Sequence, residues 1–203
     1  MSVQVIPEPA FAESASYEAS ARPRARNRFS ELVRELFSTH ALLPTRILLT
    51  AAERGAGVSF LCSHLAAEVA HQGGRVLLVD ARALLSIAAL TPGAALSLCR
   101  RAAQPGLVTL GMQEVEQEKA WDDETTPAGL PALLRAFEGE YGHLLIDAPA
   151  LSVHQDALRL ASLVSGTVLV ARRQQSRETD LKRAQALLKL HGGRLSGAIF
   201  NAY

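Results

Sequence analysis

The feature that most constrains the fold is the segment Arg46 to Leu85, in which a strand, a glycine-containing loop, a helix and a second strand follow one another. Ile47 to Thr50 is a short apolar run, and Val76 to Asp80 is a second one that ends in a carboxylate. Between them, Val58 to His71 has apolar residues at helical spacing and stops before two glycines. Continuous apolar runs are typical of parallel strands buried on both faces. The segment therefore predicts an α/β domain with a mainly parallel sheet.

The loop of this unit, Ala52 to Ser59, matches the phosphate-binding frame G-x-x-x-x-G-K-S/T at its last glycine and at its hydroxyl residue. Gly57 and Ser59 match, Gly55 adds a glycine, and Val58 stands where the lysine belongs. The lysine brings a cation to the β- and γ-phosphates, whereas valine brings none. Losing a hydrogen bond to a charged group costs about 1.5–3 kcal/mol, so we expect weak nucleotide binding to survive and efficient phosphoryl transfer to be lost. Alternatively, the glycines only form a strand-to-helix turn.

Two aspartates stand at the ends of apolar strands, Asp80 after VLLV and Asp147 after LLI. Ligands of open α/β sheets bind at the carboxyl ends of the strands. Together with Ser59, these carboxylates are placed to hold Mg²⁺ and water. Each aspartate could instead cap the turn or helix that follows it. The order of the three features favours a nucleotide-binding ancestry.

At these residues the chain resembles the bacterial tyrosine kinases of capsule and exopolysaccharide synthesis, the BY-kinases (CpsD/CapB/Wzc cytoplasmic domains), within the MinD/ParA-like P-loop ATPases. The resemblance covers Phe29 to Asn201. It implies a three-layer P-loop NTPase-like fold, with a mainly parallel central sheet flanked by helices and Asn201 near the adenine. The matching stretches are Ala51 to Ser59 for S-x-x-P-G-E-G-K-S/T, VDAR at 79–82 for VDAD, IDAPA at 146–150 for IDTPP, and the strands GTVLVAR and LSGAIFN.

The departures from the family pattern fall on charged positions. Val58 replaces the lysine and Arg82 replaces the second acid of VDAD, which predicts a pseudoenzyme with degenerate Walker motifs. We expect ATP or ADP and Mg²⁺ to bind weakly or not at all. The relic catalytic positions are Val58, Asp80, Arg82 and Asp147; the cofactor-binding candidates are Gly55, Gly57, Ser59 and Asn201; and any Mg²⁺ would be held by Ser59, Asp80 and Asp147.

Two arginines could supply the missing cation, Arg54 in the loop and Arg82 after the second strand. Arg82 could also form an internal ion pair with Asp80 or Asp147. We favour the ion pair, because two carboxylates without a metal need a counter-charge.

Composition predicts one domain with a sizeable core. The chain has 203 residues, 48% hydrophobic and 20% charged, and its net charge of +1 argues against a nucleic-acid partner. We predict a disordered tail over 1–27, a P-loop ATPase-like domain over 28–203 and a buried Cys62 without a disulfide framework. No stretch approaches the roughly 20 apolar residues that span a bilayer, and no secretory segment is recognised. Further helices are expected at Phe29 to Thr39, Ala94 to Ala103, Leu130 to Glu138, Gln155 to Leu163 and Glu178 to Leu190.

The first helix carries a second likeness to the family. Glu31 and Arg34 match the E-x-x-R-x-x-R segment through which these kinases pack into rings, and Phe37 takes the third position. We expect Phe37 to be the exposed apolar contact of a homo-oligomer or partner interface, with core packing as the alternative. The acidic stretch Gln113 to Pro127 is a loop in which Trp121 could be a second contact.

The resemblance implies a kinase-like cytoplasmic component of exopolysaccharide or capsule polymerisation and export. We expect it to be catalytically inactive and to act by binding a membrane polysaccharide co-polymerase (Wzz-like), which would hold it at the inner membrane. The relatives phosphorylate a C-terminal tyrosine cluster, whereas this chain has only Tyr203 there. The alternatives are an active or weakly active ATP-dependent tyrosine autokinase or ATPase, and a MinD/ParA-like positioning factor.

Overall fold

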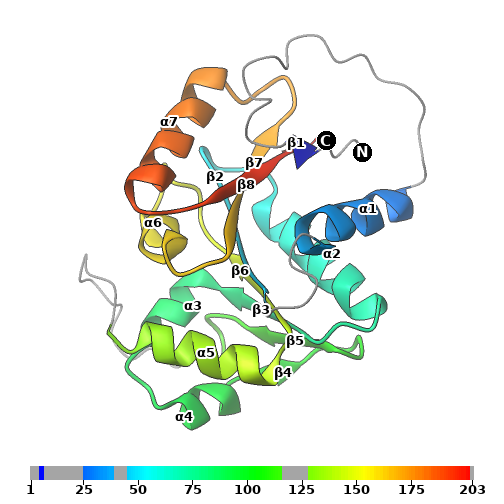
Figure 1. Cartoon of the computed structure of the whole chain (residues 1–203), viewed down its shortest axis with the longest axis vertical. Helices are drawn as coiled ribbons and strands as arrows, with labels where there is room; N and C mark the ends of the chain where they lie inside the picture. Colours follow the sequence, from blue (N-terminus) through cyan, green and yellow to red (C-terminus); the bar gives the residue numbers. More distant parts are fainter. Residues whose placement is uncertain (1–4, 7–24, 39–44, 116–127, 202–203) are drawn as a thin grey trace.

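The computed structural model describes residues 5–6, 25–38, 45–115 and 128–201. They form one eight-stranded sheet in the order β1-β8-β7-β2-β6-β3-β5-β4 (Figure 1). The six inner strands are parallel, and only the edge strands β1 and β4 pair antiparallel. The strands are β1 (Val5–Ile6), β2 (Thr45–Ala51), β3 (Val76–Asp80), β4 (Arg100–Arg101), β5 (Leu107–Leu110), β6 (His143–Asp147), β7 (Gly166–Arg172) and β8 (Leu195–Asn201).

Helices cover both faces of the sheet. The helices are α1 (Ala25–Ser38), α2 (Val58–His71), α3 (Ala81–Ser86), α4 (Pro92–Ser97), α5 (Leu130–Glu140), α6 (Asp156–Ala161) and α7 (Glu178–Leu190). Side chains alternate across each strand, so Leu49 of β2 packs in the core under α1 and α2, whereas Leu48 packs in the core under α3 to α6. The predicted α/β fold with a mainly parallel, helix-flanked sheet is confirmed.

The bounds of α2, β3, α7, β7 and β8 are those the sequence predicts. The helix expected over Ala94 to Ala103 is wrong in its second half. The Thr91 hydroxyl caps a helix that begins at Pro92, and the following Arg100–Arg101 pairs with β5. The segment over α3 was not expected to be a helix. It begins there because the Asp80 carboxylate satisfies the first free N–H groups.

The boundary between tail and domain stays a prediction. Two pieces within 1–27 have assigned structure: β1, which pairs with β8, and the start of α1 at Ala25. The side chains before Phe29 and the loop around Trp121 lie outside the described residues, as does Tyr203.

The expectation that Phe37 is exposed is wrong. Phe37 is 8% exposed, belongs to the core between α1, α2 and the sheet, and lies edge-on to the ring of His143. It shares a helix face with Val33, four residues earlier, and that face packs on the sheet. Glu31 and Arg34 are exposed on the other side of α1.

Cys62 is buried with a free thiol, as predicted, and burial raises its pKa well above the ordinary value.

Candidate functional site

The loop between β2 and α2 has the backbone shape that its glycines predict. Gly55 has φ 79° and Gly57 has φ 89°, both in the left-handed region that residues with a Cβ rarely adopt. Gly57 is the N-cap of α2, and no side chain caps this helix. The first N–H groups of a 14-residue helix are therefore open to an anion at this point.

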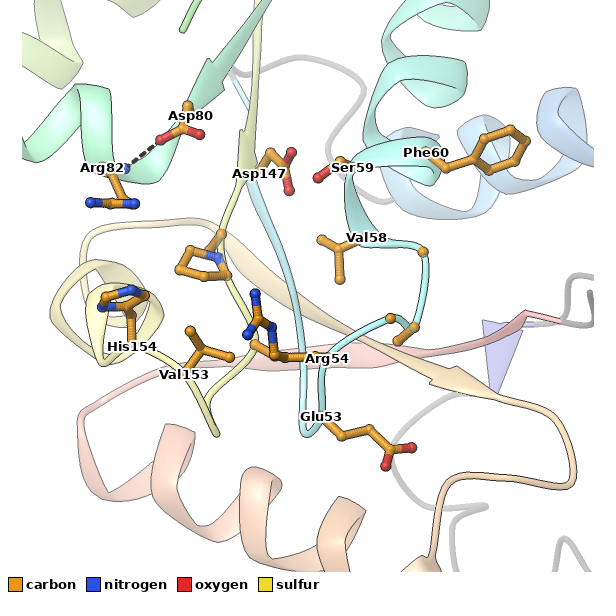
Figure 2. Close-up of a pocket in the computed structure, with 16 residues that line it drawn as sticks. Glu53, Arg54, Val58, Ser59, Phe60, Asp80, Arg82, Asp147, Val153 and His154 are labelled. Carbon is orange, nitrogen blue, oxygen red and sulfur yellow. Dashed lines mark hydrogen bonds between the residues drawn. The ribbon is translucent and has the colours of Figure 1, made fainter. Parts of the chain in front are cut away.

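A cavity of about 500 Å³ opens in front of the loop (Figure 2). It is bounded by the loop, by the ends of β3 and β6, and by the segment after β6. Seven of the predicted site residues line it: Gly55, Gly57, Val58, Ser59, Asp80, Arg82 and Asp147. Glu31, Arg34 and Phe37 lie on α1, and none of them lines this cavity.

The two strand-end carboxylates lie side by side, because Asp80 and Asp147 are register partners on β3 and β6. The Ser59 side chain lies next to the Asp147 carboxylate (Figure 2). Burial raises the pKa of Asp147, the Ser59 hydrogen bond lowers it, and the charge of Asp80 raises it. The fold thus brings the three predicted Mg²⁺ ligands together. Their oxygen atoms are of the type that Mg²⁺ prefers.

Asp80 acts as a helix cap. Its Oδ1 accepts hydrogen bonds from the backbone N–H of Arg82 at 2.8 Å and of Ala83 at 3.1 Å. The capping alternative is therefore correct for Asp80, and it accounts for a carboxylate at this strand end without any ligand.

The predicted ion pair of Arg82 is wrong. Within the described ranges, the Arg82 guanidinium pairs with neither Asp80 nor Asp147. Arg82 lies in the first turn of α3, where its backbone is bonded to Asp80 and its side chain leaves toward solvent, away from Asp147 (Figure 2). The side chain of Arg54, in contrast, points into the cavity (Figure 2).

Val58 occupies the lysine position as a packing residue. It is half-buried and packs against the core cluster under α1 and α2, and it also lines the cavity. An apolar side chain at this point offers a phosphate only dispersion contacts.

The underside of the loop is held by the ends of β7 and β8. The Asn201 amide, 1% exposed, donates to the Ala56 carbonyl at 3.0 Å. The Ser176 hydroxyl donates to the Glu53 carboxylate at 2.6 Å and accepts from the Arg172 backbone N–H. Sequence reasoning proposed Asn201 but missed the other contacts, although Arg172 also ends an apolar strand.

Two buried polar atoms at this underside, Asn201 Oδ1 and Arg172 Nε, have no hydrogen-bond partner among the described residues. The Arg172 guanidinium lies beside Gly55, within 3.9 Å of the point where a Cβ would stand. An unpaired buried polar atom costs about 1–3 kcal/mol, so a bound molecule that supplied partners here would recover part of that cost.

Comparison with solved structures yields tyrosine kinase domains and nucleotide-binding ATPases. The BceF tyrosine kinase domain is 25% identical over 87% of this chain and 75% of its own, with a TM-score of 0.68. The kinase domain of the Escherichia coli tyrosine kinase ETK is 18% identical over 97% of this chain and 86% of its own, with a TM-score of 0.72.

A more distant neighbour is the septum site-determining protein MinD from Pyrococcus horikoshii, solved with Mg-ADP. It is 20% identical over 76% of this chain and 68% of its own, with a TM-score of 0.56. No protein-family model and no curated protein sequence matches the chain. The resemblance stated from the sequence is therefore confirmed in three dimensions, and the chain has the fold shared by bacterial tyrosine kinase domains and MinD-type P-loop ATPases.

Proposed function

We propose that the chain is a kinase-like component of a bacterial capsule or exopolysaccharide polymerisation and export system that has lost catalysis. It acts by contact with a membrane polysaccharide co-polymerase, on the cytoplasmic side of the inner membrane. The tyrosine kinase domains among its structural neighbours support the kinase-like part of this proposal. In the described part of the chain, no helix is long and apolar enough to cross a membrane.

The observation that carries the proposal is Val58. A phosphoryl-transfer site of this type needs a cation at that position, and here the side chain packs on the core instead. The loop keeps its shape through bonds that need no nucleotide, from Asn201 to Ala56 and from Ser176 to Glu53. Because these protein contacts keep the loop folded without a nucleotide, the domain can serve as a docking module after catalytic activity is lost.

Nucleotide binding is a weaker, residual property in this proposal. A MinD neighbour was solved with Mg-ADP. In this chain, Asn201 Oδ1 could accept a hydrogen bond from the amino group of adenine, and Ser59, Asp80 and Asp147 would hold any Mg²⁺. A bound Mg²⁺ would supply charge neutralisation to the phosphates. The residues present favour weak affinity, because Val58 removes the lysine contact and Asp80 caps α3.

The proposal is tested by two assays on the full chain. The first measures ATP hydrolysis and phosphotyrosine formation, with the ETK kinase domain as positive control; we expect no signal above background. The second measures co-purification with the cytoplasmic segments of a polysaccharide co-polymerase from the same organism; we expect recovery. Phosphotyrosine on the purified chain would instead support the weakly active autokinase, for which Arg54 in the cavity is the available cation.

A further inference from the structure

We propose that the outer side of α7 and the turn that follows it bind an anionic lipid surface. This α7 surface runs from Lys182 to Arg194, and it acts through its basic side chains and the exposed Leu190. The inference goes beyond the proposed function, because it concerns a direct contact with lipid and takes no account of catalysis or of a protein partner.

Positive charge is concentrated in the last part of the chain. From Leu181 to Asn201 the sequence has four basic residues and no acidic one, whereas the net charge of the whole chain is +1. The basic residues are Lys182, Arg183, Lys189 and Arg194, and all four are exposed. The acid that precedes them on the helix, Glu178, is paired with Lys182 at 2.7 Å. A surface of this kind attracts anionic headgroups.

The packing of α7 turns this charge outward. The buried residues of the helix are Leu181, Ala184 and Leu188, and the last two belong to a core cluster with α6, β7 and β8. On the opposite side of the helix, exposed residues recur at helical spacing: Lys182, Arg183, Ala186 and Leu190. In Figure 1, α7 lies at the periphery of the molecule. The basic side is therefore open to a large flat partner.

Leu190 ends the helix and protrudes from it. Among the described residues it is the most exposed large apolar side chain, at 80%. The turn after it is fixed, because Gly192 has φ 74° and the Gly193 N–H donates to the Leu188 carbonyl at 2.8 Å. A Cβ at Gly193 would stand 2.8 Å from the Ala161 side chain, so the turn packs tightly on α6. Leu190 is thus held outside the core.

An exposed leucine among basic side chains fits the boundary layer of an anionic bilayer. Headgroups attract the charges, the apolar stems of lysine and arginine lie along the acyl boundary, and Leu190 enters it. A protein partner would need a pocket shaped for Leu190, whereas a bilayer accepts a protruding side chain without one. Four charges and one leucine give weak, reversible binding, comparable to that of a single lipid chain at about 10⁴ M⁻¹.

The turn lies at the opposite edge of the sheet from the glycine loop. The Arg194 carbonyl accepts a hydrogen bond from the Thr167 N–H at the start of β7, at 2.7 Å. Arg172, at the other end of the same strand, lies beside Gly55. A chain that rests on lipid through this turn therefore keeps the cavity at the edge of the sheet away from the contact.

The experiment is co-sedimentation of the full chain with vesicles. One set is phosphatidylcholine alone, and the other contains about one third phosphatidylglycerol, an anionic lipid. We expect binding to the anionic vesicles only, and its loss as NaCl is raised from about 0.1 M to about 0.5 M, since salt screens the attraction. Binding to soluble poly-glutamate is measured in parallel as a probe for an acidic protein partner.

Matched variants locate the contact. Arg183→Gln with Arg194→Gln should lower the vesicle affinity about 25-fold, because each basic residue near an anionic surface contributes about fivefold. Leu190→Gln should lower it about tenfold, because an apolar side chain no longer enters the bilayer. The control is Arg75→Gln with Arg135→Gln, which removes the same charge from exposed arginines before β3 and on α5. It should change the affinity by less than about twofold.

Circular dichroism confirms that each variant is folded, as expected for changes at exposed positions. Three results would overturn the inference: no binding to the anionic vesicles, equal binding to both sets of vesicles, or equal losses in the α7 variants and the control. Binding to poly-glutamate without binding to vesicles would also overturn it, in favour of an acidic protein. The proposed function is tested separately, by phosphotyrosine formation and co-polymerase recovery.

Discussion

Single residues in this chain show how a P-loop can persist without its lysine. Val58, at the lysine position of the frame, packs on the core, and Asp80, at a strand end, caps α3. Asn201 holds the loop through the Ala56 carbonyl, so the loop conformation depends on a protein contact. Each change is compatible with the same backbone, because the glycines at 55 and 57 supply the left-handed angles.

Replacement of Asn201 by alanine should weaken the fold. Asn201→Ala removes the side-chain donor to the Ala56 carbonyl and, within the described residues, leaves that buried acceptor unpaired, which should lower the free energy of unfolding by about 1–3 kcal/mol. Urea denaturation followed by circular dichroism measures this. Ser63→Ala serves as control, since the exposed Ser63 hydroxyl bonds only to its own helix. Equal midpoints for the two variants would show that the loop does not depend on Asn201.

Asp80 and Arg82 should differ in their effect on stability. Asp80→Ala removes the N-cap of α3 and should lower the free energy of unfolding by about 0.5–2 kcal/mol. Arg82→Ala removes an exposed guanidinium that makes no ion pair with the described residues, and it should change the free energy of unfolding by less than about 0.5 kcal/mol. Chemical denaturation of both variants decides the point. A larger loss for Arg82→Ala than for Asp80→Ala would restore the internal ion pair.

At the scale of elements, α1 is part of the domain core. Its apolar face packs on α2 and the sheet, and its exposed face carries Glu31 and Arg34. A homo-oligomer or partner interface on this helix stays a prediction, and it would use polar side chains. Phe37 would contribute only by packing the opposite face of the helix against the core.

Phe37 should consequently be a stability residue. Phe37→Ala should lower the free energy of unfolding by about 3 kcal/mol or more, because a buried aromatic ring and its edge contact with His143 are lost. Glu31→Ala, on the exposed face of the same helix, should change it by less than about 0.5 kcal/mol. Thermal and urea unfolding measure both. A Phe37→Ala protein as stable as the unmodified chain would place this side chain at the surface.

At the scale of the whole molecule, a titratable side chain, His143, lies where α1 packs on the sheet. His143 begins β6, its Nδ1 is buried without a hydrogen-bond partner in the described part of the chain, and burial lowers its pKa from 6.5. The unfolded chain therefore binds a proton at this side chain more readily than the folded chain. Stability from the neutral imidazole is complete above pH 6.5 and falls as the pH drops from there toward the folded pKa.

The unfolding free energy should accordingly decrease between about pH 7.5 and about pH 5.5, and His143→Gln should reduce that slope. Urea titrations at a series of pH values give the slope for both proteins, and their difference isolates His143 from the other histidines. An identical pH dependence in the two proteins would mean that His143 has the same pKa folded and unfolded.

The sequence by itself determined what depends on local pattern. The bounds of α2 and β3, the left-handed glycines of the loop and the carboxylates at two strand ends all follow from residue spacing and strand polarity. These features involve neighbours along the chain or the common edge of a parallel sheet, so they can be read without knowing how distant parts pack.

Only the tertiary structure decided which side chains meet. Asn201 bonds to a carbonyl 145 positions away, Phe37 turns to the core, and the Arg82 guanidinium makes no ion pair with Asp80 or Asp147 within the described residues. The sequence pattern identifies each of these residues as a candidate for the site or for an interface. It does not tell which of them contact one another in the folded chain. The direction of a side chain depends on the packing of distant elements, such as α1 against the sheet, and on the helix cap that turns Arg82 outward.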